Sequence, residues 1–308
     1  MSTTSQSLYP SRRPRFASLS SAELQQRLAH FNEKRFRPGF IDEDWRTDLA
    51  EELEMRELEG EMVEAARADL AEQIAAVPED ADAFMDWFEG LRDTGPGQND
   101  ALFPWLATRA SMEAMRWFVS QEIGGEAGFD DLVALAQVRL PAQPKLEMAR
   151  NYWDEMGRGK EPGMHGPMLE RIGQHLGVRA RIDETVWESL ALANMMAALA
   201  SNRRYAYQAI GALGAIEMTA PGRVSQVNEG LKRLGVPALA RQYFQLHAGL
   251  DIEHSKAWNR EVIRPLVEQN PCTARPIAEG ALLRLSCGAR CFERYRAELW
   301  GERRNSLH

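Results

Sequence analysis

Apolar residues recur every three or four positions along most of this chain, a spacing typical of helices with one buried face. The pattern begins near Ser20 and predicts a long, highly charged helix over about 43–76 and a shorter one over about 80–92. Residues 93–100, rich in Gly and Pro, are the clearest predicted loop. Beyond that loop we predict helices at about 106–123, 129–139, 143–157, 165–176, 183–219, 222–234, 238–268 and 274–299.

The same pattern divides the chain into three parts. We expect a flexible N-terminal tail over 1–19, an accessory layer of helices over 20–98, and a core over 99–308. Ala, Leu, Glu, Arg and Met abound, and these residues favour helices over strands because their side chains lose little rotamer freedom in a helix. The sequence therefore predicts an all-α protein with a compact helical bundle at its centre.

The acidic balance of the chain excludes one class of function. Lys and Arg number 37 against 45 Asp and Glu, which gives a formal net charge of −8. Non-specific nucleic-acid binding depends on basic side chains, so we expect no nucleic-acid partner. No apolar run approaches the roughly 20 residues of a membrane span, and the Ser-rich residues 1–15 lack the apolar segment of a signal peptide. We therefore expect a cytoplasmic protein without a membrane partner.

Two histidines and an aspartate near the C-terminal third of the chain have the spacing of metal ligands. His247, Asp251 and His254 stand at i, i+4 and i+7, so they differ by at most about 60° around a helix of 3.6 residues per turn. Two imidazoles and a carboxylate on one stripe suit iron, manganese or zinc. The alternative is a helix surface that carries these three residues by chance, although the chain has only 6 His.

A lone acid in an apolar helix is the second candidate. Glu217 is the one carboxylate between Glu188 and Glu229, in a segment dominated by Ala, Leu, Met and Gly. A helix that is apolar nearly all round is expected to be buried, and a buried carboxylate is costly unless it is paired or binds a metal. Alternatively, Glu217 lies at a helix end near Pro221 and reaches water.

A third pair is suggested by a glycine-rich break. Glu155 ends a predicted helix and His165 follows the break, so helical spacing does not bring them together; Glu161 is an alternative partner for His165. A set of three imidazoles and three carboxylates would suit two iron ions, because carboxylates bridge metals and leave positions open for dioxygen. A ferritin-like bundle is the alternative architecture, but it would show two Glu-x-x-His motifs, and only Asp251-x-x-His254 approaches that form.

With these residues in this order, the sequence resembles the haem-oxygenase-like diiron oxidases and oxygenases, also called iron-containing redox enzymes. That family takes a Glu and a His from one helical region, a Glu from a second, and His-x-x-x-Asp/Glu-x-x-His from a third. Segments 122–131 and 154–159 also look like the family's, and the resemblance covers about residues 100–268. It implies a haem-oxygenase-like bundle of about seven core helices with extra N-terminal helices. The implied ligands are Glu155, His165, Glu217, His247, Asp251 and His254.

The resemblance also implies a chemistry. Members bind two ferrous ions, use dioxygen as co-substrate and act through a peroxo-diferric intermediate. We favour a small amine or amino acid as substrate, for N-oxygenation or oxidative C–C fragmentation, over the alternative of a fatty acid that is decarboxylated or desaturated. Some relatives have an additional carboxylate near the metals, for which Glu122 is the candidate. Alternatively, Glu122 is a solvated acid at a helix end.

Candidate substrate contacts and partners are less specific. Arg203 and Tyr207 interrupt the apolar helix, where an arginine fork would bind a substrate carboxylate; alternatively, Arg203 pairs with surface acids. An external electron donor is a further expected partner. Three other classes remain: a non-catalytic haem-oxygenase-like binding protein, a thiaminase-related helical hydrolase with a nucleophilic cysteine, and a scaffold whose charged helix near 43–76 forms a homodimer.

Overall fold

The computed structural model describes residues 19–39 and 44–305, without the side chains of 302–305. Within these ranges every regular element is helical, and a single isolated bridge joins Met156 to Met164. The α-helices are α1 (Ser21–Phe36), α2 (Trp45–Asp69), α3 (Ala71–Ala75), α4 (Ala81–Thr94), α5 (Leu102–Thr108), α6 (Met112–Gly125), α7 (Phe129–Ala136), α8 (Ala142–Glu155), α9 (His165–Leu176), α10 (Trp187–Ser201), α11 (Ala206–Arg233), α12 (Gln242–Trp258), α13 (Arg264–Gln269) and α14 (Ala274–Asn305). The predicted all-α class is confirmed.

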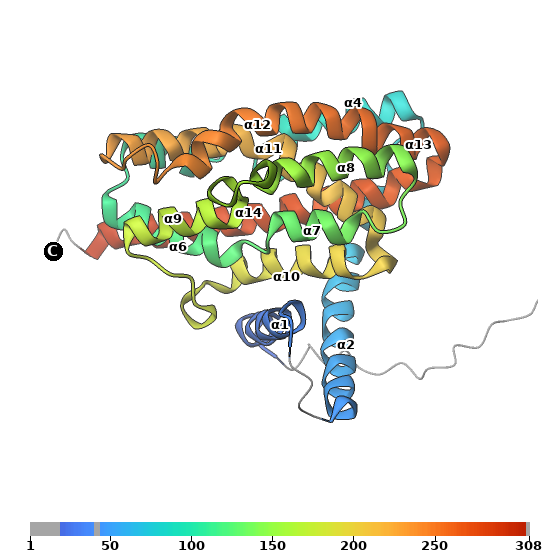
Figure 1. Cartoon of the computed structure of the whole chain (residues 1–308), viewed down its shortest axis with the longest axis horizontal. Coiled ribbons are helices and arrows are strands. Elements are labelled where there is room, and N and C mark those ends of the chain that lie inside the picture. The colour runs from blue at the N-terminus through green and yellow to red at the C-terminus, as the bar shows by residue number, and fades with distance from the viewer. Residues whose placement is uncertain (1–18, 40–43, 306–308) are drawn as a thin grey trace, which may run out of the picture.

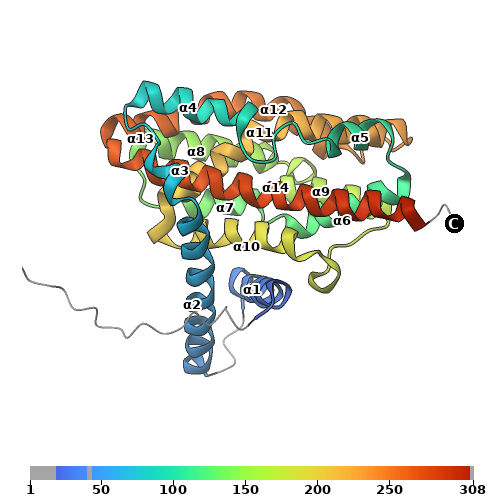
Figure 2. The ribbon, with the colours of Figure 1, turned by 180° about the vertical axis from the view of Figure 1, so that it is seen from behind.

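The long helices of the core lie side by side in a bundle, with α11 at its centre (Figure 1). This helix packs most extensively against α12 and α14, which lie on different sides of it. Seen from behind, α14 runs along most of the bundle, with α4 and α5 above it (Figure 2). Because α11 is apolar on most of its surface, it is stable only with neighbours on several sides.

The first two helices, α1 and α2, lie outside this bundle (Figure 1). Helix α1 packs on α10, and α2 projects away from the core (Figure 1). The side chain of Asn194 on α10 donates to the backbone and side-chain oxygens of Gln25 on α1, at 2.9 and 2.8 Å. Arg35 and Glu59 form a buried ion pair between α1 and α2, at 2.7 Å. The division at 98 stays a prediction, and most of the predicted tail lies outside the described residues.

The central helices differ from the sequence prediction at two places. The helix predicted over 183–219 is interrupted at Asn202, whose side chain accepts a hydrogen bond from the Arg204 amide and so competes with the helical pattern. Conversely, Pro221 was expected at a junction but lies inside α11, which continues to Arg233. The packing of α11 against two neighbours holds the helix together across the missing donor of the proline. The rejoined helix places Glu217 in its interior.

Two further predicted helices are divided. The charged helix over 43–76 breaks at Leu70 into α2 and α3, and Asp44 caps its start. The helix over 238–268 begins at Gln242 and passes through a π-helical turn, Asn259–Ile263, into α13. None of the described helices combines the length and hydropathy that crossing a bilayer requires.

Candidate metal centre

Four core helices bring the six predicted ligands to one buried region between α8, α9, α11 and α12. Glu155 is the last residue of α8 and His165 the first of α9. Glu217 lies within α11 and is 2% exposed, so the reading in which it reaches water is wrong. The other three project from the buried stripe of α12. All six are buried: Glu155, His165, Glu217, His247, Asp251 and His254.

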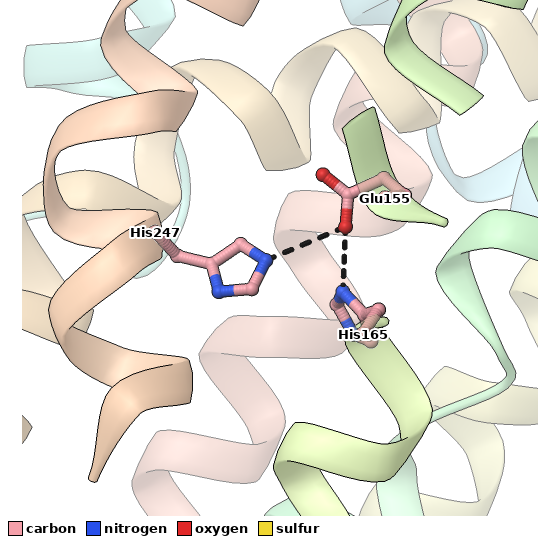
Figure 3. A group of neighbouring side chains, drawn as sticks. All are labelled: Glu155, His165 and His247. Atoms are coloured by element: carbon pink, nitrogen blue, oxygen red, sulfur yellow. Dashed lines mark hydrogen bonds and ion pairs between the residues drawn. The ribbon is translucent and has the colours of Figure 1, made fainter. Parts of the chain in front are cut away.

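The first cluster comprises Glu155, His165 and His247 (Figure 3). One carboxylate oxygen, Glu155 Oε2, lies 2.9 Å from His165 Nδ1 and 3.4 Å from His247 Nε2. One ligand atom from each residue lies within 4.8 Å of the others. The two imidazoles thus converge on the carboxylate from different helices, as ligands around one cation would.

The second cluster shares Glu155 with the first. It comprises Glu155, Glu217 and His254, whose candidate ligand atoms also lie within 4.8 Å of one another. His254 Nδ1 lies 3.7 Å from Glu155 Oε1 and 3.6 Å from Glu217 Oε2. Each oxygen of Glu155 therefore faces a different group of donors, which is the arrangement of a carboxylate that bridges two positions.

Asp251 lies beside these clusters but belongs to neither. Its side chain lines the same cavity as Glu155 and Glu217, and its Oδ1 is buried without a hydrogen-bond partner. His254 Nδ1 is likewise buried with no hydrogen bond. Such atoms are costly to bury, and a cation would satisfy both. The donor set, rich in carboxylate and imidazole, therefore fits iron.

The hairpin between α8 and α9 explains why Glu155 meets His165. Gly157 has a φ of +61° and Gly159 one of +79°, in the left-handed region that favours glycine. A Cβ on Gly157 would come within 2.5 Å of the Gly163 carbonyl carbon, so the two backbones approach as only glycine permits. This turn folds the chain back between the two ligands, a result that helical spacing could not predict.

Further groups orient two of the imidazoles. His247 Nδ1 lies 2.7 Å from the Tyr243 carbonyl, to which it donates, and this leaves Nε2 free to face Glu155. His254 Nε2 lies 3.3 Å from Asp154 Oδ2, with Nδ1 facing the cluster. Such outer partners fix the tautomer and ring orientation of a metal-binding histidine. Sequence reasoning missed Asp154, although it precedes a candidate ligand directly.

The third imidazole is held from its far side as well. His165 Nε2 lies 3.3 Å from the Tyr243 hydroxyl and 3.8 Å from Glu126 Oε2. Glu126 also accepts the Phe129 amide at 3.0 Å, which fixes the carboxylate at the start of α7. Neither Tyr243 nor Glu126 was singled out from the sequence, because both meet His165 only through the tertiary fold.

Buried charges shift the pKa values of this region. Burial raises the pKa of Glu155, but hydrogen bonds from His165 and His247 outweigh it and leave that pKa well below the usual range. Burial lowers the pKa of His165, yet Glu126 and Glu155 together raise it to about 10. Carboxylates and imidazoles therefore stabilise one another as ions when no metal is bound.

The pKa of Asp251 is raised, whereas that of Glu155 is lowered. Burial, with the nearby charges of Glu217 and Glu155, raises the pKa of Asp251 to about 8. His254, in contrast, has its pKa lowered by burial but raised overall to about 9, chiefly by Glu217. A metal ion would have to displace the protons that these groups hold near neutral pH.

A cavity of about 130 Å³ adjoins the ligand atoms. Glu122, the predicted auxiliary carboxylate, lines it together with Arg223 and Arg284, although it belongs to neither cluster. Burial raises the pKa of Glu122 against the opposing pull of the two arginines. The half-buried Glu122 therefore lies on the cavity wall, and its role as an auxiliary carboxylate stays a prediction.

The two predicted substrate contacts lie elsewhere. Arg203 is exposed and donates to the carbonyls of Leu135 and Ala136, at 3.5 and 3.1 Å. Tyr207 is 37% exposed. Neither residue lines the cavity beside the ligands. The short break between α10 and α11 places both side chains at the surface. There Arg203 caps the end of α7.

Comparisons with known proteins agree with this geometry. A family model described as iron-containing redox enzyme matches residues 116–289, more than half of the chain. A crystal structure of a CADD-like protein of unknown function from Nostoc punctiforme is similar in fold, with a TM-score of 0.53 and 17% sequence identity. The alignment covers 71% of this chain and 98% of that one. No curated protein matches.

Proposed function

The chain belongs to the family of iron-containing redox enzymes, and from this premise we propose that it is a non-haem diiron oxidase or oxygenase. The proposed substrate is a small amine or amino acid, which is N-oxygenated or cleaved oxidatively at a C–C bond. The proposal is finer than the family membership in three respects: the number of irons, the use of dioxygen and the class of substrate.

The shared carboxylate carries the proposal of two irons. Glu155 is a member of both buried clusters, one completed by His165 and His247, the other by Glu217 and His254. A single ion would engage the donors of one cluster and leave the donors of the other cluster without a metal. Two ions would engage both clusters, with Glu155 as their common residue and Asp251 as a sixth donor.

The roles of the chain's own residues follow from their placement. When bound, a pair of ferrous ions supplies electrons for the activation of dioxygen. The three imidazoles and three carboxylates hold the ions, and Asp154 and Tyr243 keep two imidazole rings oriented. Burial of the ligands by the surrounding helices excludes bulk water from the reaction.

The cavity supports a small polar substrate over a fatty acid. Its volume of about 130 Å³ is below the roughly 300–1,000 Å³ of pockets for drug-sized ligands and is close to that of a cavity that accepts benzene. Glu122, Arg223 and Arg284 give part of its wall ionic character, which an alkyl chain would not favour. A haem would need far more room than this cavity offers.

Metal analysis of the purified chain tests this proposal. After anaerobic loading with Fe(II) and removal of free metal, we expect two irons per chain. His247→Ala and Glu217→Ala each remove a donor from a different cluster, so each variant should retain fewer irons. Substrate-dependent dioxygen consumption should follow only in chains that hold both ions.

Two outcomes would contradict the proposal. One is a content of no more than one iron that neither substitution changes. The other is a chain that holds two irons but consumes no dioxygen with any of the amines and amino acids tested. Arg203→Gln is a matched control, because this surface side chain contacts only backbone carbonyls and should leave the iron content unchanged. The expected external electron donor and homodimer stay predictions.

A further inference from the structure

Two arginines line the cavity beside the ligands, among several apolar side chains. Arg223 comes from α11 and Arg284 from α14, and both line the cavity with Glu122 of α6. Arg223 Nη2 donates to Thr219 Oγ1 at 3.1 Å, and its guanidinium lies 5.5 Å from the ring centroid of Phe292. These contacts hold the Arg223 head group in place without neutralising it.

The guanidinium groups lack the partners that buried arginines normally have. Arg284 Nε is buried with no hydrogen bond. Among the described side chains, those of 19–39 and 44–301, no carboxylate oxygen lies within the 4.0 Å of an ion pair from Arg223 or Arg284. An arginine offers five N–H donors in a fixed fork, and burying its charge unpaired is costly. Such a pair facing a cavity is suited to an anion that enters it.

We propose that Arg223 and Arg284 bind the carboxylate of the substrate, which makes a free amino acid, and not a simple amine, the substrate of the enzyme. This inference rests on the proposed function for the reaction that follows, but the binding step stands independently of iron. The planar guanidinium matches a carboxylate in two parallel hydrogen bonds, so the pair would also fix the direction in which the substrate points.

Charge balance supports a substrate that carries one carboxylate. Apart from the predicted ligands and Glu126, the wall holds two guanidinium groups and one carboxylate, Glu122, so these three groups leave one positive charge. Glu126, the next acid in the chain, faces His165 and accepts the Phe129 amide, and so is already engaged. An amino acid would supply the missing negative charge and bring an ammonium group that Glu122 or the ligand carboxylates can accept.

The spacing along α11 suits a compact ligand. Arg223 follows Glu217 by six residues, which is about 9 Å along a helix that rises 1.5 Å per residue. A short amino acid held at one end by Arg223 would therefore extend towards the metal-binding side chains. A fatty acid in the same orientation would have to place its long chain among ionic groups.

The position of Arg223 also suggests a route of entry. A surface hollow of about 560 Å³ is lined by Phe103 and Arg223, and the same two residues line the buried cavity. They therefore form the partition between the hollow and the cavity. A substrate carboxylate that moved from the hollow into the cavity would pass Arg223 at this partition.

Calorimetry on the iron-free, full-length chain tests the proposal. The probes are the common L-amino acids, each paired with its amide, together with octanoate as the fatty-acid probe. We expect at least one amino acid to bind about tenfold or more tightly than its amide, because the amide lacks the anion. The proposal is overturned if no amino acid is preferred over its amide, or if octanoate binds more tightly than every amino acid.

Substitutions then identify the groups responsible. Arg223→Gln and Arg284→Gln should each weaken amino-acid binding about tenfold or more while leaving amide binding unchanged. The corresponding Lys variants should recover part of the loss, and Arg203→Gln should match the unaltered chain. Unaltered amino-acid affinity in both Gln variants would overturn the assignment. Iron content is measured separately, so a chain that binds amino acids but fails to hold two irons would contradict the proposed function alone.

Discussion

Helix α11 has two neighbours that it meets in opposite ways. Against α14 the two backbones nearly touch: a Cβ on Gly211 would lie 1.8 Å from the Ile277 carbonyl oxygen, and one on Gly280 would lie 1.8 Å from that of Gln208. Against α12 the central contacts are ionic, between Glu217 and His254. Close packing of backbones stabilises the first interface, whereas the second combines the packing of Trp258 on α11 with a buried pair of opposite charges.

The difference separates what folds the protein from what the proposed metal would stabilise. The apolar contacts between α11 and α14 are complete within the chain, because buried apolar surface and dispersion need no ligand. The middle of α12 leaves Asp251 Oδ1 and His254 Nδ1 without hydrogen bonds, although Phe244 and Trp258 anchor its two ends. We therefore expect the two sides of α11 to respond differently to substitution, metal and pH.

The largest expected effect is on the close-packed side. Gly211→Ala would place a methyl group against a backbone oxygen, so α11 and α14 would have to move apart. Overpacking of this kind typically costs about 1–3 kcal/mol and occasionally more, and the rigid obstacle here puts the change at the upper end. Thermal unfolding should therefore begin at a clearly lower temperature. The ion pair between Glu217 and His254 in the middle of α12 should be retained.

The same helix supplies the control for that experiment. Gly222 also lies in α11, but a Cβ there meets nothing within 4 Å. Gly222→Ala should raise stability by roughly 0.5–1 kcal/mol, because alanine favours the helix over glycine. Equal stability of the two variants would show that the α11–α14 contact is looser than the structure indicates.

The next largest effect concerns metal removal. A metal that binds only the folded state stabilises it by about 2.7 kcal/mol when present at 100 times its dissociation constant. Because three candidate ligands lie on α12, we expect hydrogen exchange over 247–254 to slow when Fe(II) is bound, whereas exchange over 206–215 stays the same. Equal protection of α12 with and without iron would contradict the contrast between the two interfaces.

The sequence allowed one part of the centre to be predicted and not another. His247, Asp251 and His254 share a helix, so their common face follows from 3.6 residues per turn. The meeting of Glu155 with His165 depends on a left-handed turn and a close backbone approach, which spacing alone does not determine. Local order was therefore predictable where the ligands lie on one element, and only the family resemblance joined the elements.

The break between α10 and α11 and the arginine pair were missed for different reasons. Asn202 interrupts an alanine-rich segment without a Gly or Pro, and its competing side-chain hydrogen bond was the available signal. Arg203 consequently lies at the surface, although the sequence predicted that it contacts the substrate. Arg223 and Arg284 lie on separate helices, so no spacing rule relates them, and only the packing of α11 on α14 places them together.

A smaller effect is expected from pH in the metal-free chain. Asp251 has a pKa raised from 3.8 to about 8, so its protonated form favours the folded state below pH 3.8 and this contribution is lost as pH rises through 8. His165, raised from 6.5 to about 10, likewise loses its contribution as pH rises through 10. Both shifts have the same sign, so the metal-free chain should unfold at a lower temperature at pH 9 than at pH 7.

Iron should reverse that trend, because its ligands must lose their protons before they bind. The stabilisation that Fe(II) adds is thus expected to be greater at pH 8 than at pH 6, under anaerobic conditions. Asp251→Asn is the matched variant, since an amide does not titrate, and it should flatten the decline of the metal-free chain above pH 7. A metal-free chain whose unfolding temperature rises towards pH 9 would show that burial and the neighbouring charges do not raise the pKa values of these groups.

The smallest effect is expected where α12 meets α8 through an orienting group. Asp154 Oδ2 lies 3.3 Å from His254 Nε2, on the side of the ring opposite Glu217. Asp154→Asn keeps the shape but removes the charge that holds the imidazole, and loss of such a partner typically weakens metal binding about 10- to 100-fold. We expect a change near the lower limit, because Asp154 is half-buried and also pairs with Arg158. Arg158→Gln, which alters the pair from its exposed side, should leave iron affinity nearly unchanged; a loss as large as that of Asp154→Asn would mean that the hairpin, and not the imidazole, is what Asp154 positions.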